Sequence, residues 1–153
     1  MTFSPSDPGF AARVRRSFEA QALMRLLGAS LERVEPGEVD IALGHRPDLT
    51  QQHGYLHAGV LTAVADSACG YAAYTLMAED SEVLSVEFKL NLLRPAAGEW
   101  FVARGRVVRA GRTLTTTAAD VFAFGHRGAR DGTLVATMLG TMIRQSRHGG
   151  PDP

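Results

Sequence analysis

The chain has 153 residues, a length that folds as one domain with roughly two thirds of its unfolded surface buried in a single core. Sixteen basic and sixteen acidic side chains give a formal net charge of zero, which excludes the strong positive field of a nucleic-acid or anionic-membrane binder. With 45% hydrophobic and 21% charged residues, the composition is that of a folded globular protein. Cys69 is the single cysteine, so no internal disulfide can form.

Residues 1–9 contain two prolines and a glycine and predict a flexible tail. Charged residues interrupt any export signal here, so we expect a cytoplasmic protein that is not bound to a membrane. From Phe10 to Leu26, apolar residues recur at four-residue spacing and predict one amphipathic helix that stops near Gly28. Arg13 and Arg16 fall on the other face of this helix, where we expect both to be solvated.

Two elements follow in the first half of the chain. Alternating segments around 31–34 and 39–43 flank Pro36-Gly37 and predict a hairpin. Residues 58–78 lack proline and are rich in alanine and leucine, which predicts a long helix. This helix is apolar on nearly all sides and must be buried, and its many small residues allow a sheet to approach its backbone. Within it, Cys69 is expected to be a small buried hydrophobe and not a nucleophile.

Four strands are predicted in the second half, over residues 84–92, 100–109, 114–124 and 134–145, followed by a flexible tail at 146–153. In the first of these strands, apolar residues from Leu84 to Leu92 alternate with polar ones, so Ser85 is expected on the face opposite Leu84 and Phe88. The order of elements predicts an α+β fold in which an antiparallel sheet of about six strands wraps around one long central helix. Residues 10–145 form this single domain.

Asp66 falls in the middle of the predicted buried helix. An ionised carboxylate costs several kcal/mol there unless it is paired or hydrogen-bonded. It is either a general base or nucleophile with a functional role, or a structural carboxylate satisfied by its surroundings or by a subunit contact. The helix alone does not separate these two interpretations.

The segment that leads into the helix favours the catalytic interpretation. Gln51, Ala58 and Asp66 follow one another at spacings of seven and eight residues. This pattern resembles that of the hotdog-fold acyl-CoA thioesterases of the phenylacetate-degradation (PaaI-like) type, in which an Asn or Gln precedes a His-Gly-Gly helix start and an Asp or Glu follows inside the helix. Ala58 replaces the first glycine of the pair, and Gly59 keeps the second. The resemblance implies a hotdog fold and hydrolysis of an acyl-CoA or aryl-CoA, with no cofactor.

Thioester hydrolysis explains these residue types. The reaction places negative charge on the carbonyl oxygen, and the free N–H groups of Ala58 and Gly59 at the helix start are suited to bind it, with the Gln51 amide beside them. Asp66 then activates a water or attacks directly. Eight helical residues separate Ala58 from Asp66 by roughly 12 Å, so both cannot reach one carbonyl carbon. We therefore expect a homodimer with sites shared across a two-fold interface, either alone or paired into a tetramer.

Several other residues have both a functional and a structural interpretation. Similar enzymes use a Ser or Thr at the place of Ser85 to hold the attacking water, although an ordinary strand serine is equally expected. His53 and His57 are candidates for contact with substrate, but a histidine near a helix start more often caps the helix. No group of side chains has metal-ligand spacing.

Arginines beside turns are the remaining candidates. Arg94, Arg109 and Arg112 are able to bind the phosphates of coenzyme A, because guanidinium binds phosphate bidentately, although turn arginines are more often merely solvated. One alternative function keeps the fold without the reaction, as an acyl-CoA binding module in which Asp66 is structural. A hotdog dehydratase would need a histidine close to the catalytic carboxylate, and Asp66 has none within a helical turn.

Overall fold

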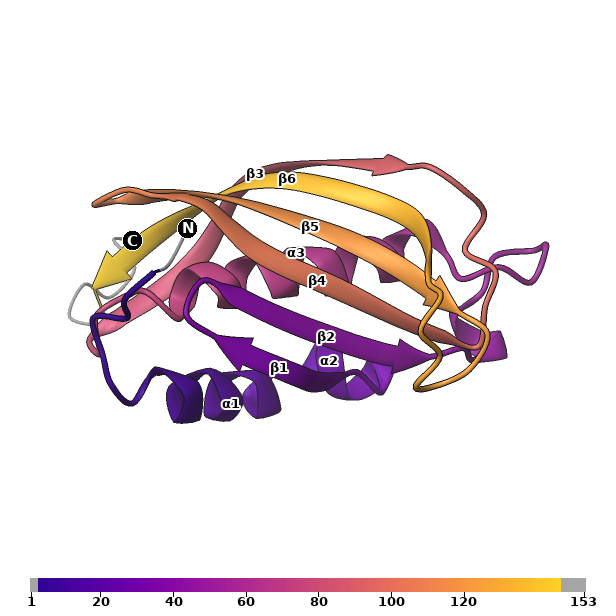
Figure 1. The fold of residues 1–153 in the computed structure, drawn as a ribbon, viewed down its shortest axis with the longest axis horizontal. Helices are drawn as coiled ribbons and strands as arrows, with labels where there is room; N and C mark the ends of the chain where they lie inside the picture. Colours follow the sequence, from indigo (N-terminus) through magenta and orange to yellow (C-terminus); the bar gives the residue numbers. More distant parts are fainter. Residues whose placement is uncertain (1–2, 147–153) are drawn as a thin grey trace.

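Six antiparallel strands form one sheet that curves around helix α3 in the computed structural model, which describes residues 3–146 (Figure 1). The strands lie in the order β1-β2-β4-β5-β6-β3. Their bounds are β1 Ser30–Glu35, β2 Glu38–Gly44, β3 Ser81–Leu92, β4 Trp100–Ala110, β5 Leu114–Phe124 and β6 Thr133–Ser146. The helices are α1 Phe10–Ala20, α2 Ala22–Leu27, the short 3-10 helix η1 Pro47–Leu49 and α3 Ala58–Tyr74. The predicted sheet around one long helix is confirmed.

The N-terminal helix is divided in two. Gln21 has an extended backbone, with φ −75° and ψ 108°, and separates α1 from α2. The prediction of one continuous helix is wrong at this residue. Apolar spacing cannot reveal the break, because Phe18 before it and Met24 after it are both buried in the same core. The predicted stop is confirmed, since Gly28 ends α2 in the left-handed conformation at φ 68°.

Arg13 is buried, with only 4% of its surface exposed, so the prediction that it is solvated is wrong. Its Nε lies 3.1 Å from a carboxylate oxygen of Asp7. Its Nη atoms donate to the carbonyl oxygens of Ala78, Met77 and Tyr74 at 2.6, 2.8 and 3.2 Å. These carbonyls lie at and just beyond the end of α3, where helical partners run out, and a guanidinium with five donors can satisfy several at once.

Residues 3–9, which we expected to form a flexible tail, lie against the rest of the molecule. Asp7 is buried beside Arg13, and the Ser6 hydroxyl donates to the carbonyl oxygen of Leu76 at 3.0 Å. Phe3 packs on Gly37, where an added Cβ would lie 2.5 Å from the phenyl ring. Residues 1–2 and 147–153 of the expected tails lie outside the described residues.

Helix α3 is covered by strands and by α1, except along one stripe. It contacts β2 to β6, and the approach is closest at Gly105 of β4, where an added Cβ would lie 2.4 Å from the carbonyl oxygen of Ala68. The small residues of α3 therefore do allow a close sheet. Burial raises the pKa of the Cys69 thiol to about 12, which fits the predicted inert residue. The exposed or half-buried stripe of α3 consists of Ala58, Gly59, Thr62, Ala63, Asp66, Ser67 and Gly70. No helix among the described residues is long and apolar enough to cross a membrane.

Strand β3 forms one edge of the sheet and pairs only with β6 (Figure 1). A bulge at Val86 changes its register, because Ser85 pairs with Met142 and Glu87 with the adjacent Thr141. The predicted simple alternation is therefore wrong. Paired residues on neighbouring strands point to the same face of the sheet. Ser85 pairs with Met142, and Leu90, which follows the bulge, pairs with Met138. Both methionines are buried, so Ser85 and the apolar residues after the bulge lie on the face that covers α3.

Candidate active site

Asp66 and Ser85 meet beneath the sheet. Asp66 projects from the stripe of α3 that the strands leave uncovered, so its carboxylate is half-buried and not enclosed. The Ser85 hydroxyl donates to Asp66 Oδ1 at 2.7 Å and also lies 3.4 Å from the sulfur of Met142. Within residues 3–146, Oδ2 of Asp66 accepts no hydrogen bond. One carboxylate oxygen is thus held in place and the other is left for a water or a substrate atom.

A cavity of about 140 Å³ opens beside this pair. It lies between α1, α3 and the first residues of β3, and the side chains around it are mainly polar. Its lining residues are Ser17, Gln21, Asp66, Ser67, Gly70, Tyr71, Glu82, Val83 and Ser85. A cavity of this size beside a hydrogen-bonded carboxylate has room for part of a small substrate.

The start of α3 presents a single free backbone donor. His57 is the N-cap residue, and its Nδ1 accepts a hydrogen bond from the backbone N–H of Gly59 at 2.9 Å. The N–H of Gly59, a predicted oxyanion donor, is therefore occupied. The N–H of Ala58 has no acceptor within residues 3–146. His57 takes the capping role that its position favours.

The same contact explains which glycine of the expected pair is kept. A Cβ on Gly59 would lie 3.0 Å from His57 Nδ1, so a side chain there would press on the capping ring. Ala58 has no such restriction, because its backbone is helical and its methyl group borders a cavity. The exchange of glycine for Ala58 therefore retains the backbone donor.

Gln51 lies in the turn before α3, and its side chain is oriented by that turn. The side-chain oxygen Oε1 accepts a hydrogen bond from the backbone N–H of His53. The backbone N–H of Gln51 donates to the carbonyl oxygen of Tyr55 at 2.9 Å. The side-chain NH₂ is left as a donor, which is the polarity needed to hold a substrate carbonyl oxygen. The imidazole of His53 is exposed, and this residue enters the turn through its backbone.

Gln51 and Ala58 line a second cavity of about 280 Å³, separate from the one beside Asp66. Apolar side chains from the turn, α3 and β3 make up most of its wall. The full lining is Gln51, Tyr55, Leu56, Ala58, Leu61, Leu92, Arg94, Pro95 and Ala96. One chain therefore holds the predicted carbonyl-binding groups and the predicted base at two different places.

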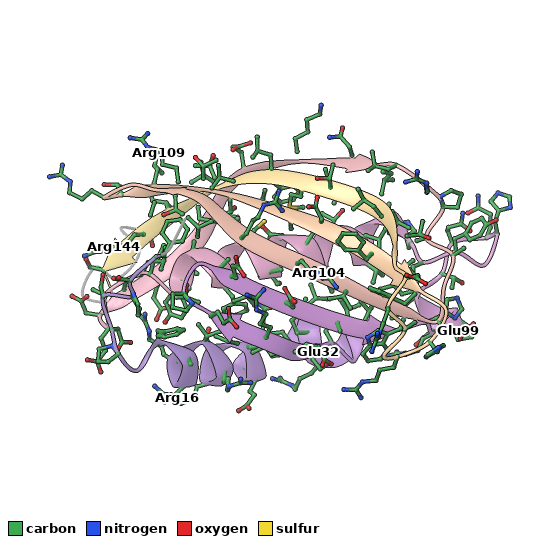
Figure 2. The ribbon with its side chains drawn as sticks, viewed as in Figure 1. Arg16, Glu32, Glu99, Arg104, Arg109 and Arg144 are labelled. Carbon is green, nitrogen blue, oxygen red and sulfur yellow. The ribbon has the colours of Figure 1, made fainter. Side chains whose placement is uncertain are left out.

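The three candidate arginines are also separated. Arg94 lines the cavity at Gln51, and its Nη1 donates to the carbonyl oxygen of Leu134 at 2.9 Å. Arg109 lies at the end of the molecule opposite Glu99, as Arg144 does (Figure 2). Glu99 lies at the same end of the molecule as Gln51, because its backbone carbonyl oxygen accepts a hydrogen bond from the N–H of His45, which begins the loop that leads to Gln51.

Arg112 lies in the turn between β4 and β5 and lines a different cavity, together with Arg144. The structure thus brings Arg94 to the start of α3, and it places Arg109 and Arg112 far from that start within the same chain.

Of the residues around the Asp66 cavity, sequence analysis identified only Asp66 and Ser85 as site residues. Among those it missed, Ser17 belongs to α1, Gln21 is the residue between α1 and α2, and Tyr71 comes from the second half of α3. The pattern of the first helix contains a signal for Ser17 and Gln21, since both are polar and four residues apart, but nothing in it shows that this polar stripe faces α3. Only the packing of α1 on α3 reveals it.

Residues 53–130 match the family model described as "Thioesterase superfamily", which is about half of the chain. The chain belongs to the thioesterase superfamily. Thioesterases are hydrolases, so the protein belongs to a superfamily of hydrolases. The matched segment contains Ala58, Asp66 and Ser85.

Three known proteins illustrate the relationship. A thioesterase family protein from Silicibacter pomeroyi is 47% identical, with a TM-score of 0.86 over 90% of this chain and 99% of that one. The medium/long-chain acyl-CoA thioesterase YigI of Escherichia coli is 26% identical over 112 residues, which are 63% of this chain and 72% of that protein. The Escherichia coli PaaI protein from the phenylacetic acid degradation operon is 19% identical, with a TM-score of 0.79 over 90% of this chain and 94% of that one. The last likeness shows the shared hotdog fold.

Proposed function

We propose that this protein hydrolyses acyl-CoA or aryl-CoA thioesters to a free acid and coenzyme A. The observation that carries the proposal is the Asp66 carboxylate, which one hydrogen bond from Ser85 holds beside a cavity while its second oxygen is left unpaired. Such a carboxylate is ready to take a proton or to attack a carbonyl carbon. Membership of the thioesterase superfamily supports the assignment.

The reaction has two routes with the same products. In the first, Asp66 takes a proton from a water, the water oxygen bonds to the carbonyl carbon, and the carbon–sulfur bond then breaks. The thiolate of coenzyme A leaves and receives the proton. In the second, Asp66 itself attacks, coenzyme A leaves, and water hydrolyses the resulting mixed anhydride. In both, the N–H of Ala58 and the NH₂ of Gln51 bind the carbonyl oxygen as its negative charge develops.

We further propose that the working unit is a homodimer in which each site takes Asp66 and Ser85 from one chain and Gln51 and Ala58 from its partner. The two cavities of one chain are separate, and a two-fold axis with antiparallel α3 helices joins each with its counterpart. β3 supports this assembly, because it is an unpaired edge with exposed apolar side chains, among them Leu84 and Phe88.

The arginines acquire a role in such a dimer. The Arg109 and Arg112 end of one chain lies next to the α3 start of the other when the helices run antiparallel. Together with Arg94 they then supply guanidinium groups for the phosphates of coenzyme A. We assign this chemistry to a single domain of residues 10–145 in the cytoplasm, where a lone reduced cysteine is expected.

The deciding experiment measures release of free thiol from a panel of acyl-CoAs by the wild type and Asp66→Asn. Loss of the base or nucleophile should lower turnover at least about a hundredfold, while the isosteric asparagine keeps the fold, as judged by circular dichroism and Tm. Turnover of Asp66→Asn within a few-fold of the wild type would instead favour a non-catalytic acyl-CoA binding module.

A further inference from the structure

Ser85 reaches Asp66 from a weakly restrained part of the sheet. It lies on β3, which forms an edge, and the bulge at Val86 directly follows it. A neighbouring strand therefore restrains Ser85 from one side only, and the ladder of backbone pairs is interrupted beside it. In a single chain Ser85 is also exposed. The backbone alone thus leaves the direction of its hydroxyl group open.

Met142 lies directly opposite Ser85 on the neighbouring strand β6. We infer that Met142 is a positioning residue, whose thioether sulfur holds the Ser85 hydroxyl against the Asp66 carboxylate. The inference rests on the proposed thioester hydrolysis, and it goes beyond it by giving a role in the reaction to a residue that does not contact the substrate.

Met142 is a fixed point within the sheet. It is fully buried, and β6 lies between β5 and β3, so Met142 has a paired residue on each side, Thr115 on β5 and Ser85 on β3. Its methyl group lies close to Gly140, where an added Cβ would be 3.4 Å from it. A side chain enclosed in this way has little freedom to move. Because none of its surface is exposed, any effect of Met142 on a substrate must pass through another residue.

The sulfur suits this role because it is a weak acceptor of hydrogen bonds. Ser85 has one hydroxyl hydrogen and two acceptors within reach, Asp66 Oδ1 at 2.7 Å and Met142 Sδ at 3.4 Å. An ionised carboxylate is the stronger acceptor, so the hydrogen points to Asp66. The polarizable sulfur packs favourably against the hydroxyl oxygen in that state. A strong acceptor at the same place would compete with Asp66 for the hydrogen, and a hydrocarbon would attract the hydroxyl less.

The direction of the Ser85 hydroxyl matters for the reaction. A serine side chain has three staggered rotamers, and the observed one brings Oγ to both Asp66 and Met142. In a rotamer that turns Oγ away, Asp66 Oδ1 would lose the one hydrogen bond that it accepts within residues 3–146. The carboxylate would then be free to rotate, and Oδ2 would no longer be held toward the reacting carbonyl group. Loss of the sulfur should therefore slow the chemical step and leave substrate binding nearly unchanged.

Met142→Leu tests this role, because it removes the sulfur with little change in side-chain volume. We expect kcat for a hydrolysed acyl-CoA to fall about three- to tenfold, the effect of losing one neutral contact of this kind, with KM within about twofold. Met138→Leu is the matched control, since Met138 is also buried on the same face of β6 and pairs with Leu90. It should leave both constants near those of the wild type. An unchanged kcat in Met142→Leu, or an equal loss in Met138→Leu, would contradict the inference.

A second substitution shows whether the effect passes through Ser85. Ser85→Ala keeps the Asp66 carboxylate, so we expect its turnover to be reduced but measurable. In the Ser85→Ala chain, Met142→Leu should have no further effect on kcat, because the group that the sulfur positions is absent. If Met142→Leu lowers kcat by the same factor with and without the Ser85 hydroxyl, Met142 acts through packing alone and the inference is wrong.

Norleucine separates the sulfur from the shape of the side chain, because it is methionine with a CH₂ group in place of the sulfur. Wild-type protein with norleucine at its methionine positions should lose kcat as Met142→Leu does. The same replacement in Met142→Leu should cause no further loss, which excludes an effect of the other methionines. Selenomethionine keeps a polarizable acceptor and should leave kcat near that of the wild type. Full activity of the norleucine-labelled wild type would show that the sulfur has no role.

Crystal structures of the wild type and Met142→Leu test the geometry without any turnover. We expect one Ser85 rotamer in the wild type, with Oγ in hydrogen-bond contact with Asp66, and a second rotamer turned away from Asp66 in Met142→Leu. If the rotamers differ in this way but the wild type hydrolyses no acyl-CoA, the proposed reaction fails and the positioning stands. A single, unchanged Ser85 rotamer in Met142→Leu overturns the positioning, whatever the activity.

Discussion

Ala58 occupies the first position of α3, and this position allows its backbone N–H to be tested without harm to the helix. Proline is well tolerated there, since that N–H has no helical partner, and His57 before it already has the φ of −63° and ψ of 140° that a residue preceding proline adopts. Ala58→Pro removes only the proposed oxyanion donor. We expect kcat to fall about 10²- to 10³-fold with the Tm nearly unchanged.

Ala58→Gly is the control for that experiment, because it keeps the N–H and restores the glycine of the family pattern. Its kcat should stay within a few-fold of the wild type. If Ala58→Pro also retains wild-type kcat, the N–H of Ala58 does not bind the developing oxyanion.

Gln51 should act on the same oxygen through its side-chain NH₂. One such donor stabilises the transition state by about 2 to 4 kcal/mol in comparable sites, so Gln51→Ala should lower kcat more than it raises KM. Steady-state kinetics with a hydrolysed acyl-CoA separates the two constants. A change in KM alone would reduce Gln51 to a substrate-binding residue.

Arg13 links α1 and the segment before it to the end of α3 through an ion pair and hydrogen bonds. Its removal leaves Asp7 as an unpaired buried carboxylate and several carbonyl oxygens without donors. We expect Arg13→Leu to lower the free energy of unfolding by about 3 to 5 kcal/mol, as breaking one half of a buried ion pair does. Urea denaturation measures this loss, and the exposed Arg16→Leu should change stability by no more than about 0.5 kcal/mol.

The same elements show what sequence alone can predict. The hairpin and the later strands follow from apolar alternation, because burial on one face leaves a direct trace in residue spacing, and the long helix follows from an alanine- and leucine-rich composition without proline. The break at Gln21 and the bulge at Val86 leave no such trace, since each changes direction or register at a single residue. Arg13 was misjudged for a related reason: its partners are backbone carbonyls more than 60 residues away.

The candidate site, like the fold, could be predicted only in part. Gln51, Ala58 and Asp66 can be recognised in the sequence because their spacing along the chain matches a known pattern. The free NH₂ of Gln51 and the occupied N–H of Gly59 depend on local hydrogen bonds, which the residue types do not determine. Ser17 and Tyr71 lie 54 residues apart, so their meeting is a property of the folded chain alone.

For the whole molecule, the proposed dimer predicts complementation between two inactive chains. A heterodimer of Asp66→Asn and Gln51→Ala contains one site with both residues intact and one with both defects. Co-expressed chains with different tags should therefore recover up to about half of the wild-type activity per heterodimer. Heterodimers that purify through both tags and remain inactive would show that Asp66 works with Gln51 of its own chain.

The pairing of β3 with β6 has a consequence for the order in which the protein matures during synthesis. Ser85 leaves the ribosome long before Met142, its partner 57 residues further along the chain, and β3 has no other neighbouring strand within the sheet. Until β6 is made, the apolar edge strand lacks the strand that it pairs with in the folded protein, and Ser85 lacks its neighbour Met142. Pairings between distant segments form slowly and leave such edges open to aggregation meanwhile. The nascent chain therefore completes the surroundings of its carboxylate–serine pair only after β6 has been made.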